Sequence, residues 1–208
     1  MQISIRLFCL LLAASTVFTS CSNPIDPSLV TDEGVVIGSI DGMPIRWATR
    51  NVDAPGTFAP NPESAGMLFQ WNRAKGWNNN NEDTPRNWNI ARSEGTTWYA
   101  MNDPCPKGWR VPTVEELRAL RSAGSEWAEL NGVRGHFFGT EPNRIFLPAA
   151  GRRRVNGVLV SVNGWGHYWS STPGSDVMWA WHMQLHSGRP YMKSNLRING
   201  FSVRCVAE

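Results

Sequence analysis

The sequence predicts an α+β domain dominated by antiparallel sheet, and three observations support this prediction. One segment, residues 113–123, has a complete helix signature. Many short apolar or alternating runs, which favour strands, are separated by turn residues. The chain of 208 residues also contains 19 glycines, which suit the tight turns that join short antiparallel strands.

The expected helix runs from Thr113 to Ala123. Thr113 and Glu116 match the T-x-x-E capping box, in which each side chain satisfies a backbone N–H at the helix start. Apolar residues recur on one face at helical spacing, namely Val114, Leu117 and Leu120. Gly124 then provides a natural stop.

Short strands are expected elsewhere. Residues 35–47 read as two strands around the turn Asp41-Gly42, and residues 177–186 alternate as a strand does. Further strands are expected at 145–149, 158–162 and 201–207. Residues 63–75 leave two alternatives open, a second helix or a strand within 66–71.

The first 20 residues have the plan of a secretory signal. Arg6 precedes an apolar run over residues 7–14, which is too short to span a bilayer, and small or polar residues follow. The junction Phe18-Thr19-Ser20-Cys21 looks like a bacterial lipobox, so we expect Cys21 to be acylated. The alternative is an ordinary cleaved signal with a chance cysteine.

Acyl chains on Cys21 would hold the protein at a membrane. Ser22 gives no inner-membrane retention signal of the Asp type, so we expect an outer-membrane lipoprotein exposed at the cell surface. Residues 21–34 would form a flexible tether, because residues 22–34 carry two prolines, three acids and little apolar surface. Residues 35–208 would form a single domain.

Cysteine usage points to one disulfide. Of the four cysteines, Cys9 leaves with the signal and Cys21 goes to lipid, so Cys105 and Cys205 remain. Two cysteines in an oxidising compartment usually pair, and we expect a bond between them. The alternative is a pair of buried free thiols.

Charge argues against a nucleic-acid partner. With Arg6 removed, 19 of the 20 basic residues remain against 17 acidic ones, a net charge of +2. Nucleic-acid binding needs a concentrated basic face, which this balance does not suggest.

Tryptophan is the most conspicuous feature of the composition, with eleven residues. The segment 71–89 interleaves tryptophans with Asn, Arg and Asp and shows neither helical nor strand periodicity. Flat indole faces beside amides suit sugar rings. The predicted ligand-binding residues are Trp71, Trp77, Asn79, Trp88 and Trp165. The alternative is a long loop pinned by buried tryptophans.

Catalytic and metal signatures are scarce, and we expect no catalytic residue and no cofactor. His182 and His186 have H-x-x-x-H spacing, but Met183 stands where a zinc protease needs Glu. On a strand, those histidines would lie about 13 Å apart, too far for one metal. The alternative cofactor is calcium, held by Glu141 and Asn143 in an E-P-N tripeptide like that of mannose-type C-type lectins.

Several separated motifs carry a family resemblance. They are NDPCPKGWRVPT at 102–113, LPAAGRR at 147–153, NGWGHYWSST at 163–172 and GFSVRCV at 200–206. Upstream, IRWATRNVD at 45–53 and GMLFQW at 66–71 fit the same pattern. In this order they resemble the Fibrobacter succinogenes major paralogous domain, which is common in surface lipoproteins of Bacteroidetes and Fibrobacteres.

This resemblance implies a C-type lectin-like mixed α/β fold with long irregular loops, and cysteines matching Cys105 and Cys205. It supplies no agreed catalytic residues. Formylglycine-generating enzymes share that broader fold but use active-site cysteines, and no third cysteine remains in this domain.

The sequence therefore predicts a non-enzymatic binding module that recognises glycan or protein through its Trp/Asn-rich loops. The alternative is an accessory or tip subunit of a fimbria-like assembly, with an exposed edge strand that awaits a donor strand. A polysaccharide-active enzyme would need a pair of carboxylates in a cleft, for which Glu82 and Asp83 are the candidates.

Overall fold

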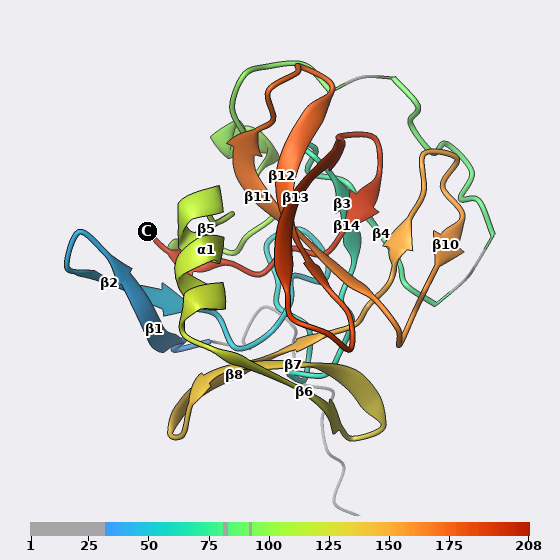
Figure 1. Cartoon of the computed structure of the whole chain (residues 1–208). Coiled ribbons are helices and arrows are strands. Elements are labelled where there is room, and N and C mark those ends of the chain that lie inside the picture. Colours follow the sequence, from blue (N-terminus) through green and yellow to red (C-terminus); the bar gives the residue numbers. More distant parts are fainter. Residues whose placement is uncertain (1–31, 81–82, 92) are drawn as a thin grey trace, which may run out of the picture.

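The computed structural model describes residues 32–80, 83–91 and 93–208 (Figure 1). These ranges do not include the expected signal peptide, the lipidation site Cys21 or the expected tether up to residue 31. Asp32, at the end of that tether, is already part of the folded domain. Its carboxylate accepts hydrogen bonds from the backbone N–H and the hydroxyl of Thr49, at 2.7 and 2.8 Å.

The described residues form four antiparallel sheets. The first has the order β1 (Val35–Ile40), β2 (Met43–Trp47), β15 (Val206–Ala207) and β5 (Trp109–Arg110). The second has the order β10 (Leu159–Val160), β9 (Arg152–Arg153), β14 (Gly200–Phe201), β3 (Leu68–Gln70) and β4 (Gly76–Trp77).

The other two sheets are three-stranded. One consists of β11 (Gly166–Pro173), β12 (Trp179–Leu185) and β13 (Tyr191–Leu196), and the other of β6 (Ser125–Leu130), β7 (Val133–Thr140) and β8 (Asn143–Pro148). The helical elements of the described chain are α1 (Val114–Ser122) and the short 3-10 helix η2 (Ala100–Asn102).

The expected α+β, C-type lectin-like fold is wrong, because the described chain is mostly β and holds a single α-helix of nine residues. The second helix considered within residues 63–75 is absent there. Gly66 has a φ of 65°, and a Cβ at this position would collide with the carbonyl of Val52. The chain then enters β3, which pairs with β14 and β4 on its two sides.

The predicted helix is confirmed as α1. The Thr113 hydroxyl accepts a hydrogen bond from the Glu116 N–H, and the Glu116 carboxylate accepts one from the Thr113 N–H. The apolar face places Leu117 and Leu120 in the core, as its helical spacing predicts.

The strand predictions are confirmed in part. The β1–β2 hairpin turns at Asp41-Gly42 as expected, and β8, β10 and β12 cover the core of three other predicted strands. The strand expected over residues 201–207 is wrong, because its two ends belong to different sheets. Phe201 pairs with Phe69, whereas Val206 pairs with Trp47 and Arg110.

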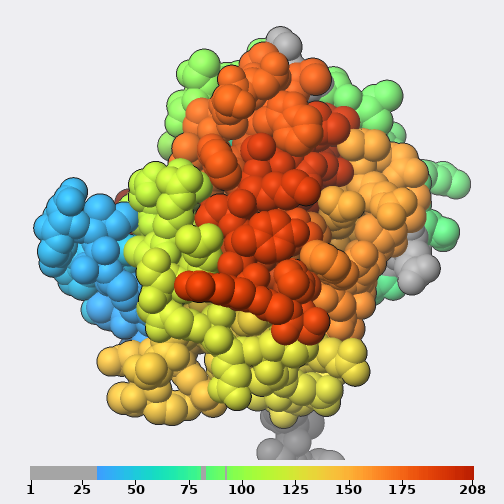
Figure 2. All heavy atoms as spheres, in the orientation of Figure 1, coloured from blue at the N-terminus to red at the C-terminus, as the bar shows by residue number. Residues whose placement is uncertain are grey.

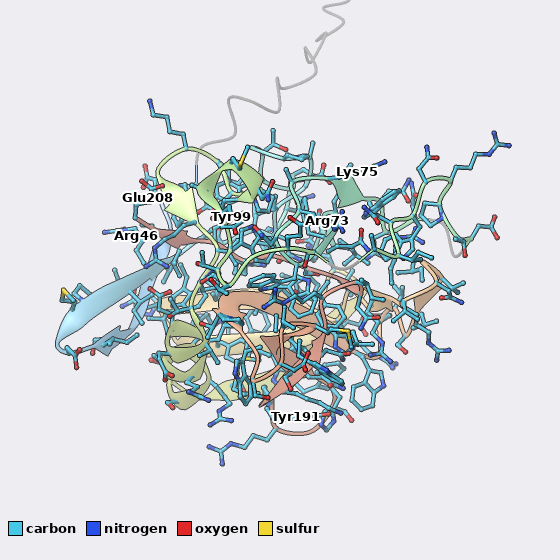
Figure 3. All side chains as sticks on the ribbon, turned by 90° about the horizontal axis from the view of Figure 1, so that it is seen from above. Arg46, Arg73, Lys75, Tyr99, Tyr191 and Glu208 are labelled. Carbon is cyan, nitrogen blue, oxygen red and sulfur yellow. A yellow bond between two sulfur atoms is a disulfide. The ribbon has the colours of Figure 1, made fainter. Side chains whose placement is uncertain are left out.

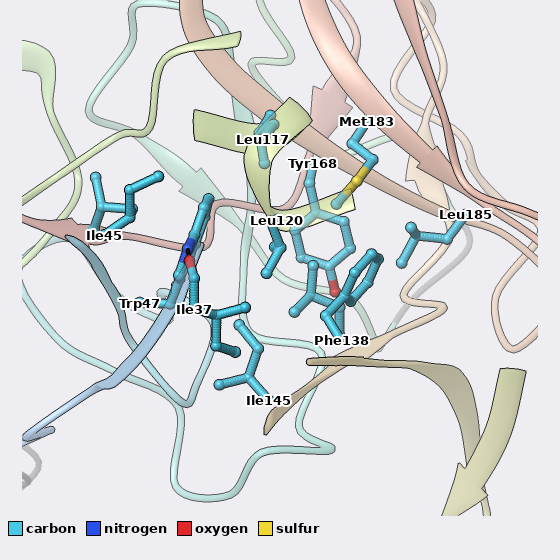
Figure 4. Packing of buried hydrophobic residues seen from close by; sticks show 12 residues of the cluster. Ile37, Ile45, Trp47, Leu117, Leu120, Phe138, Ile145, Tyr168, Met183 and Leu185 are labelled. Carbon is cyan, nitrogen blue, oxygen red and sulfur yellow. Dashed lines mark hydrogen bonds between the residues drawn. The ribbon is translucent and has the colours of Figure 1, made fainter. Parts of the chain in front are cut away.

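Two apolar clusters lie between these elements. In the first, α1 packs between the β1–β2 hairpin and the strands β11 and β12, above the sheet formed by β6, β7 and β8 (Figures 1, 2 and 4). Leu117 and Leu120 from the helix meet Tyr168, Phe138 and other buried side chains in this space. The second cluster collects Trp71, Trp169, Phe201 and their neighbours.

The expected disulfide between Cys105 and Cys205 is present in the structure. Cys205 belongs to the second cluster and Cys105 packs against it. The bond therefore ties the segment before α1 to the C-terminal strand region, across a sequence separation of 100 residues.

Two buried histidines form a polar contact inside the molecule. Nδ1 of His167 lies 3.4 Å from Nε2 of His182, and Phe201 packs against both rings. Burial lowers the pKa of His182 to about 3, and burial together with the nearby His182 lowers the pKa of His167 well below its ordinary value. Both side chains are neutral at pH 7 and are protonated in the unfolded chain at lower pH.

Removal of the disulfide should lower stability. For the double variant Cys105→Ala/Cys205→Ala we expect the free energy of unfolding to fall by about 4–5 kcal/mol, because the bond closes a loop of 100 residues. Urea denaturation of the variant and the parent protein measures this difference. A loss below about 1 kcal/mol would contradict the prediction.

Acid should also lower stability through the two histidines. Between pH 6.5 and about 3 the unfolded chain binds a proton at His182 that the folded chain excludes, so the free energy of unfolding falls by about 1.4 kcal/mol per pH unit from this residue. His167, whose pKa is also lowered by burial, acts in the same direction. The variant His182→Phe keeps a ring in the same space and should have a shallower slope. Urea midpoints at several pH values measure it, and an unchanged slope would refute this role.

Candidate functional site

A polar groove of about 710 Å³ lies beside the segment that joins β3 to η2. Figure 3 shows Arg73, Lys75 and Tyr99 on this side of the molecule, with Tyr191 on the opposite side. Amide, charged and aromatic side chains predominate among the residues that line it. They are Gln70, Asn72, Arg73, Ala74, Lys75, Trp77, Asn87, Asn89, Ala91, Ser93, Glu94, Tyr99 and Asn102.

Asn72 organises the wall of this groove. It has a φ of 55° in the turn that follows β3, a conformation that asparagine tolerates better than most residues. Its amide nitrogen donates to the Glu94 carbonyl, at 2.9 Å, and its amide oxygen accepts from the Tyr99 N–H, at 2.8 Å. One buried side chain therefore fastens both edges of the 94–99 segment to β3.

Three buried polar atoms in the groove residues have no hydrogen-bond partner among the described residues. They are Arg73 Nε, Trp77 Nε1 and Ser93 Oγ. All three can donate a hydrogen bond. An unpaired buried donor costs about 1–3 kcal/mol. The groove residues therefore have hydrogen-bonding capacity that the described part of the chain does not use.

Positive charge accompanies these donors. Arg73 donates from Nη2 to the Ala91 carbonyl, at 2.9 Å, and burial lowers the pKa of its guanidinium. The ammonium of Lys75 lies 4.1 Å from the centre of the Trp77 ring. Glu94 is the one carboxylate among the described lining residues. The groove therefore suits an oxygen-rich ligand, whether neutral or negatively charged.

The aromatic surface that a ligand can reach belongs to Tyr99, which is 42% exposed. Trp77 is only 7% exposed, because Lys75 lies over its ring and Trp88 packs against it at 5.1 Å. Tyr99 thus supplies the exposed ring that the sequence led us to expect from tryptophan.

The predicted ligand-binding residues do not gather at one site. Trp71 is fully buried, and its indole N–H donates to the Ser170 carbonyl at 2.8 Å. Trp88 lies half-buried beside Trp77 and donates to the Val155 carbonyl. Asn79 donates to the Ala150 carbonyl at 2.6 Å, and Trp165 is 39% exposed beside His186. Only Trp77 lines the groove.

The calcium candidates Glu141 and Asn143 lie exposed at the turn between β7 and β8. The Glu141 carboxylate is ion-paired there with the guanidinium of Arg144. Within the part of the chain that the structure describes, no three His, Cys, Asp or Glu side chains gather closely enough to hold a metal. Calcium binding by this turn stays a prediction.

Sequence reasoning did not single out Arg73, Ser93 or Tyr99. Each stands among polar residues without periodicity, and their proximity depends on the Asn72 hydrogen bonds across 22 to 27 positions. The only local signal in the sequence is the residue type at position 72, because asparagine tolerates a positive φ. It indicates a turn after β3 but not what that turn faces.

No helix in the described part of the chain is long and apolar enough to cross a membrane.

Substitution of Asn72 should destabilise the groove wall formed by residues 94–99. For Asn72→Ala we expect a loss of about 3 kcal/mol in the free energy of unfolding, because buried groups lose their partners and alanine is strained at this φ. Urea denaturation measures the change. The control Asn143→Ala alters an exposed asparagine and should stay within about 0.5 kcal/mol. Equal effects would contradict the role of Asn72.

Comparison with known proteins identifies a family. No curated protein and no solved structure matches the chain. Residues 67–207, two thirds of its length, match the family model described as the Lcl C-terminal domain. This is not the family that the motifs resembled, and membership of the Fibrobacter paralogous family stays a prediction. The β1–β2 hairpin precedes the matched region. The chain belongs to the Lcl C-terminal domain family.

Proposed function

We propose that this protein is a non-enzymatic binding module that takes a glycan into the groove beside Tyr99. The observation that supports this best is the set of three buried, unpartnered polar atoms on Arg73, Trp77 and Ser93, all in residues that line one groove. A sugar offers many hydroxyl oxygens, each of which accepts and donates hydrogen bonds. Such a ligand matches an array of donors and amides better than an apolar ligand does.

Tyr99 adds an apolar surface to the polar groove. Its exposed ring offers an apolar face beside the polar wall, and sugar rings present C–H faces as well as hydroxyl edges. Tyrosine supplies contact area while losing little conformational entropy on binding, because its side chain has two rotatable angles. The groove therefore combines a flat platform with directional polar contacts.

The module would act at the cell envelope. Acylation of Cys21 would anchor it to the outer membrane, and the residues between Cys21 and Asp32 would separate the lipid from the folded domain. Surface display would bring the groove within reach of extracellular polysaccharide.

An enzyme that acts on polysaccharide fits the groove less well. Most glycosidases use two carboxylates on opposite sides of the bond that they cleave, about 5–9.5 Å apart. The described residues that line the groove include a single carboxylate, Glu94. Of the two acids considered for this role, Asp83 is exposed outside the groove, and Glu82 lies outside the described residues.

An assembly role is the second candidate, and one edge strand favours it. β13 pairs with β12 without interruption from Tyr191 to Leu196 and forms the edge of its sheet. A regular edge of this kind can accept a further strand. β1 is a poorer acceptor, because its register shifts between Val36 and Ser39.

The binding proposal predicts a defined response in a glycan screen. The protein should bind selectively to members of a panel of neutral and acidic polysaccharides, and Tyr99→Ala should weaken this binding about tenfold through loss of the stacking platform. Trp165→Ala is the matched control, because Trp165 is similarly exposed but does not line the groove. Circular dichroism confirms that each variant is folded.

The same screen separates the alternatives. A blank panel with folded protein would refute the glycan proposal and favour the assembly role. Loss of binding in Trp165→Ala but not in Tyr99→Ala would place the site outside the groove. Binding should persist in chelator, and its loss would instead implicate calcium at Glu141 and Asn143.

A further inference from the structure

A second pocket, of about 460 Å³, lies where the end of α1, the paired strands β6 and β7, and the turn between β12 and β13 meet. It is separate from the groove and shares no lining residue with it. Arg121 comes from the last turn of α1, Trp127 and His136 from the two strands, and Arg189 from the turn.

The pocket is positively charged. Its described lining contains two guanidinium groups, Arg121 and Arg189, and no carboxylate. Neither arginine forms an ion pair with a described residue. The negative end of the helix dipole lies nearby and offsets about half a unit charge, which leaves the pocket cationic.

Two buried nitrogen atoms of residues that line this pocket, Arg121 Nε and His136 Nδ1, have no hydrogen-bond partner among the described residues. His136 is only 2% exposed, and its ring is held between Trp127, at 5.1 Å, and Phe138. Its other nitrogen, Nε2, lies 2.8 Å from the carbonyl oxygen of His186. A carbonyl can only accept, so Nε2 carries a proton and donates it.

This hydrogen bond determines whether Nδ1 of His136 can donate or accept a hydrogen bond. Burial lowers the pKa of His136, so the ring is neutral at pH 7, and with the proton on Nε2 its Nδ1 is an acceptor. The residues that line the pocket thus combine cationic donors with one buried acceptor. An anion that also carries a hydroxyl hydrogen matches both.

We propose that this pocket binds a phosphate group, either as inorganic phosphate or as the phosphate monoester of a sugar. Phosphate carries a charge of about −1.5 to −2 at pH 7, which matches two guanidinium groups. Its second pKa near 6 leaves a fraction with a P–O–H hydrogen, which can be donated to Nδ1 of His136. Sulfate and carboxylate carry no such hydrogen at this pH.

The ring of Trp127 and the hydroxyls of Ser125 and Ser187 also line the pocket. The hydroxyls can donate to further phosphate oxygens, and the half-buried indole offers an apolar surface for the carbon skeleton of a monoester. The proposal does not depend on the groove, so either site can fail its test without the other.

Calorimetric titration of the full-length protein tests the proposal, with inorganic phosphate, mannose 6-phosphate, sulfate and acetate as probes. Phosphate should bind in the millimolar range and more tightly than sulfate or acetate. Arg121→Met and Arg189→Met should each weaken phosphate binding about tenfold, because each removes a charge-assisted hydrogen bond. Arg154→Met is the control, because Arg154 is exposed and lies outside the pocket.

The variants separate the outcomes. Arg189 is exposed in a turn, so Arg189→Met should fold even if Arg121→Met does not. His136→Gln keeps an amide nitrogen near the position of Nε2 and removes Nδ1, and it should abolish the preference for phosphate over sulfate. Tighter binding of mannose 6-phosphate than of inorganic phosphate would identify a sugar phosphate, and the reverse would identify the free ion.

Three results would overturn the proposal. They are no binding of either phosphate at millimolar concentration, unchanged phosphate binding in Arg189→Met, or sulfate binding as tight as that of phosphate in the parent protein.

Discussion

Three arginine side chains that lie wholly inside the molecule hold its irregular segments in place, namely Arg153, Arg197 and Arg204. Each donates to backbone carbonyls in neighbouring segments. Arg204 reaches the carbonyls of Ala48 and Phe146, and Arg197 reaches those of Gly95 and Trp179. Buried carbonyls need partners, and a guanidinium offers five donors in a fixed plane. Burial lowers the pKa of Arg204 to about 10, which still leaves this side chain charged at neutral pH.

The groove depends on this arrangement. Arg197 also lies 3.9 Å from the centre of the Trp71 ring, so the same guanidinium packs on the core and holds the segment that carries Tyr99. Residues 78–81 are all asparagine, and Arg153 holds the chain near both ends of this run. Its guanidinium donates to the carbonyls of Asn78 and Asp83. The fold itself therefore holds the described parts of the loops around the groove in place. Such preorganisation reduces the entropy that binding must overcome.

The sequence predicted the elements whose signals are local. The Thr113 capping box and the Asp41-Gly42 turn each act within a few residues, and both were predicted correctly. The fold class was not, because the short strands β3 and β14 gain their identity only by pairing across 130 residues. Composition likewise revealed abundant tryptophan but not which rings are exposed. Trp71 was predicted to bind ligand because its sequence neighbours are polar. It is buried instead, in contact with Trp98 and Ser170.

The groove and the pocket lined by Arg121 and Arg189 share one physical feature, which is that some of their residues have buried polar atoms without a partner among the described residues. Each such atom costs about 1–3 kcal/mol, a large share of the total stability of a domain this size. Native proteins leave few buried polar groups unpaired, and those they do leave call for an explanation. Five of the eight such side-chain atoms in the described part of the chain belong to residues that line these two pockets. The described linings hold four cationic side chains and one carboxylate. If the two proposals hold, a ligand rich in oxygen atoms removes that cost when it binds, and this gain offsets the stability that the scaffold gives up to keep these atoms.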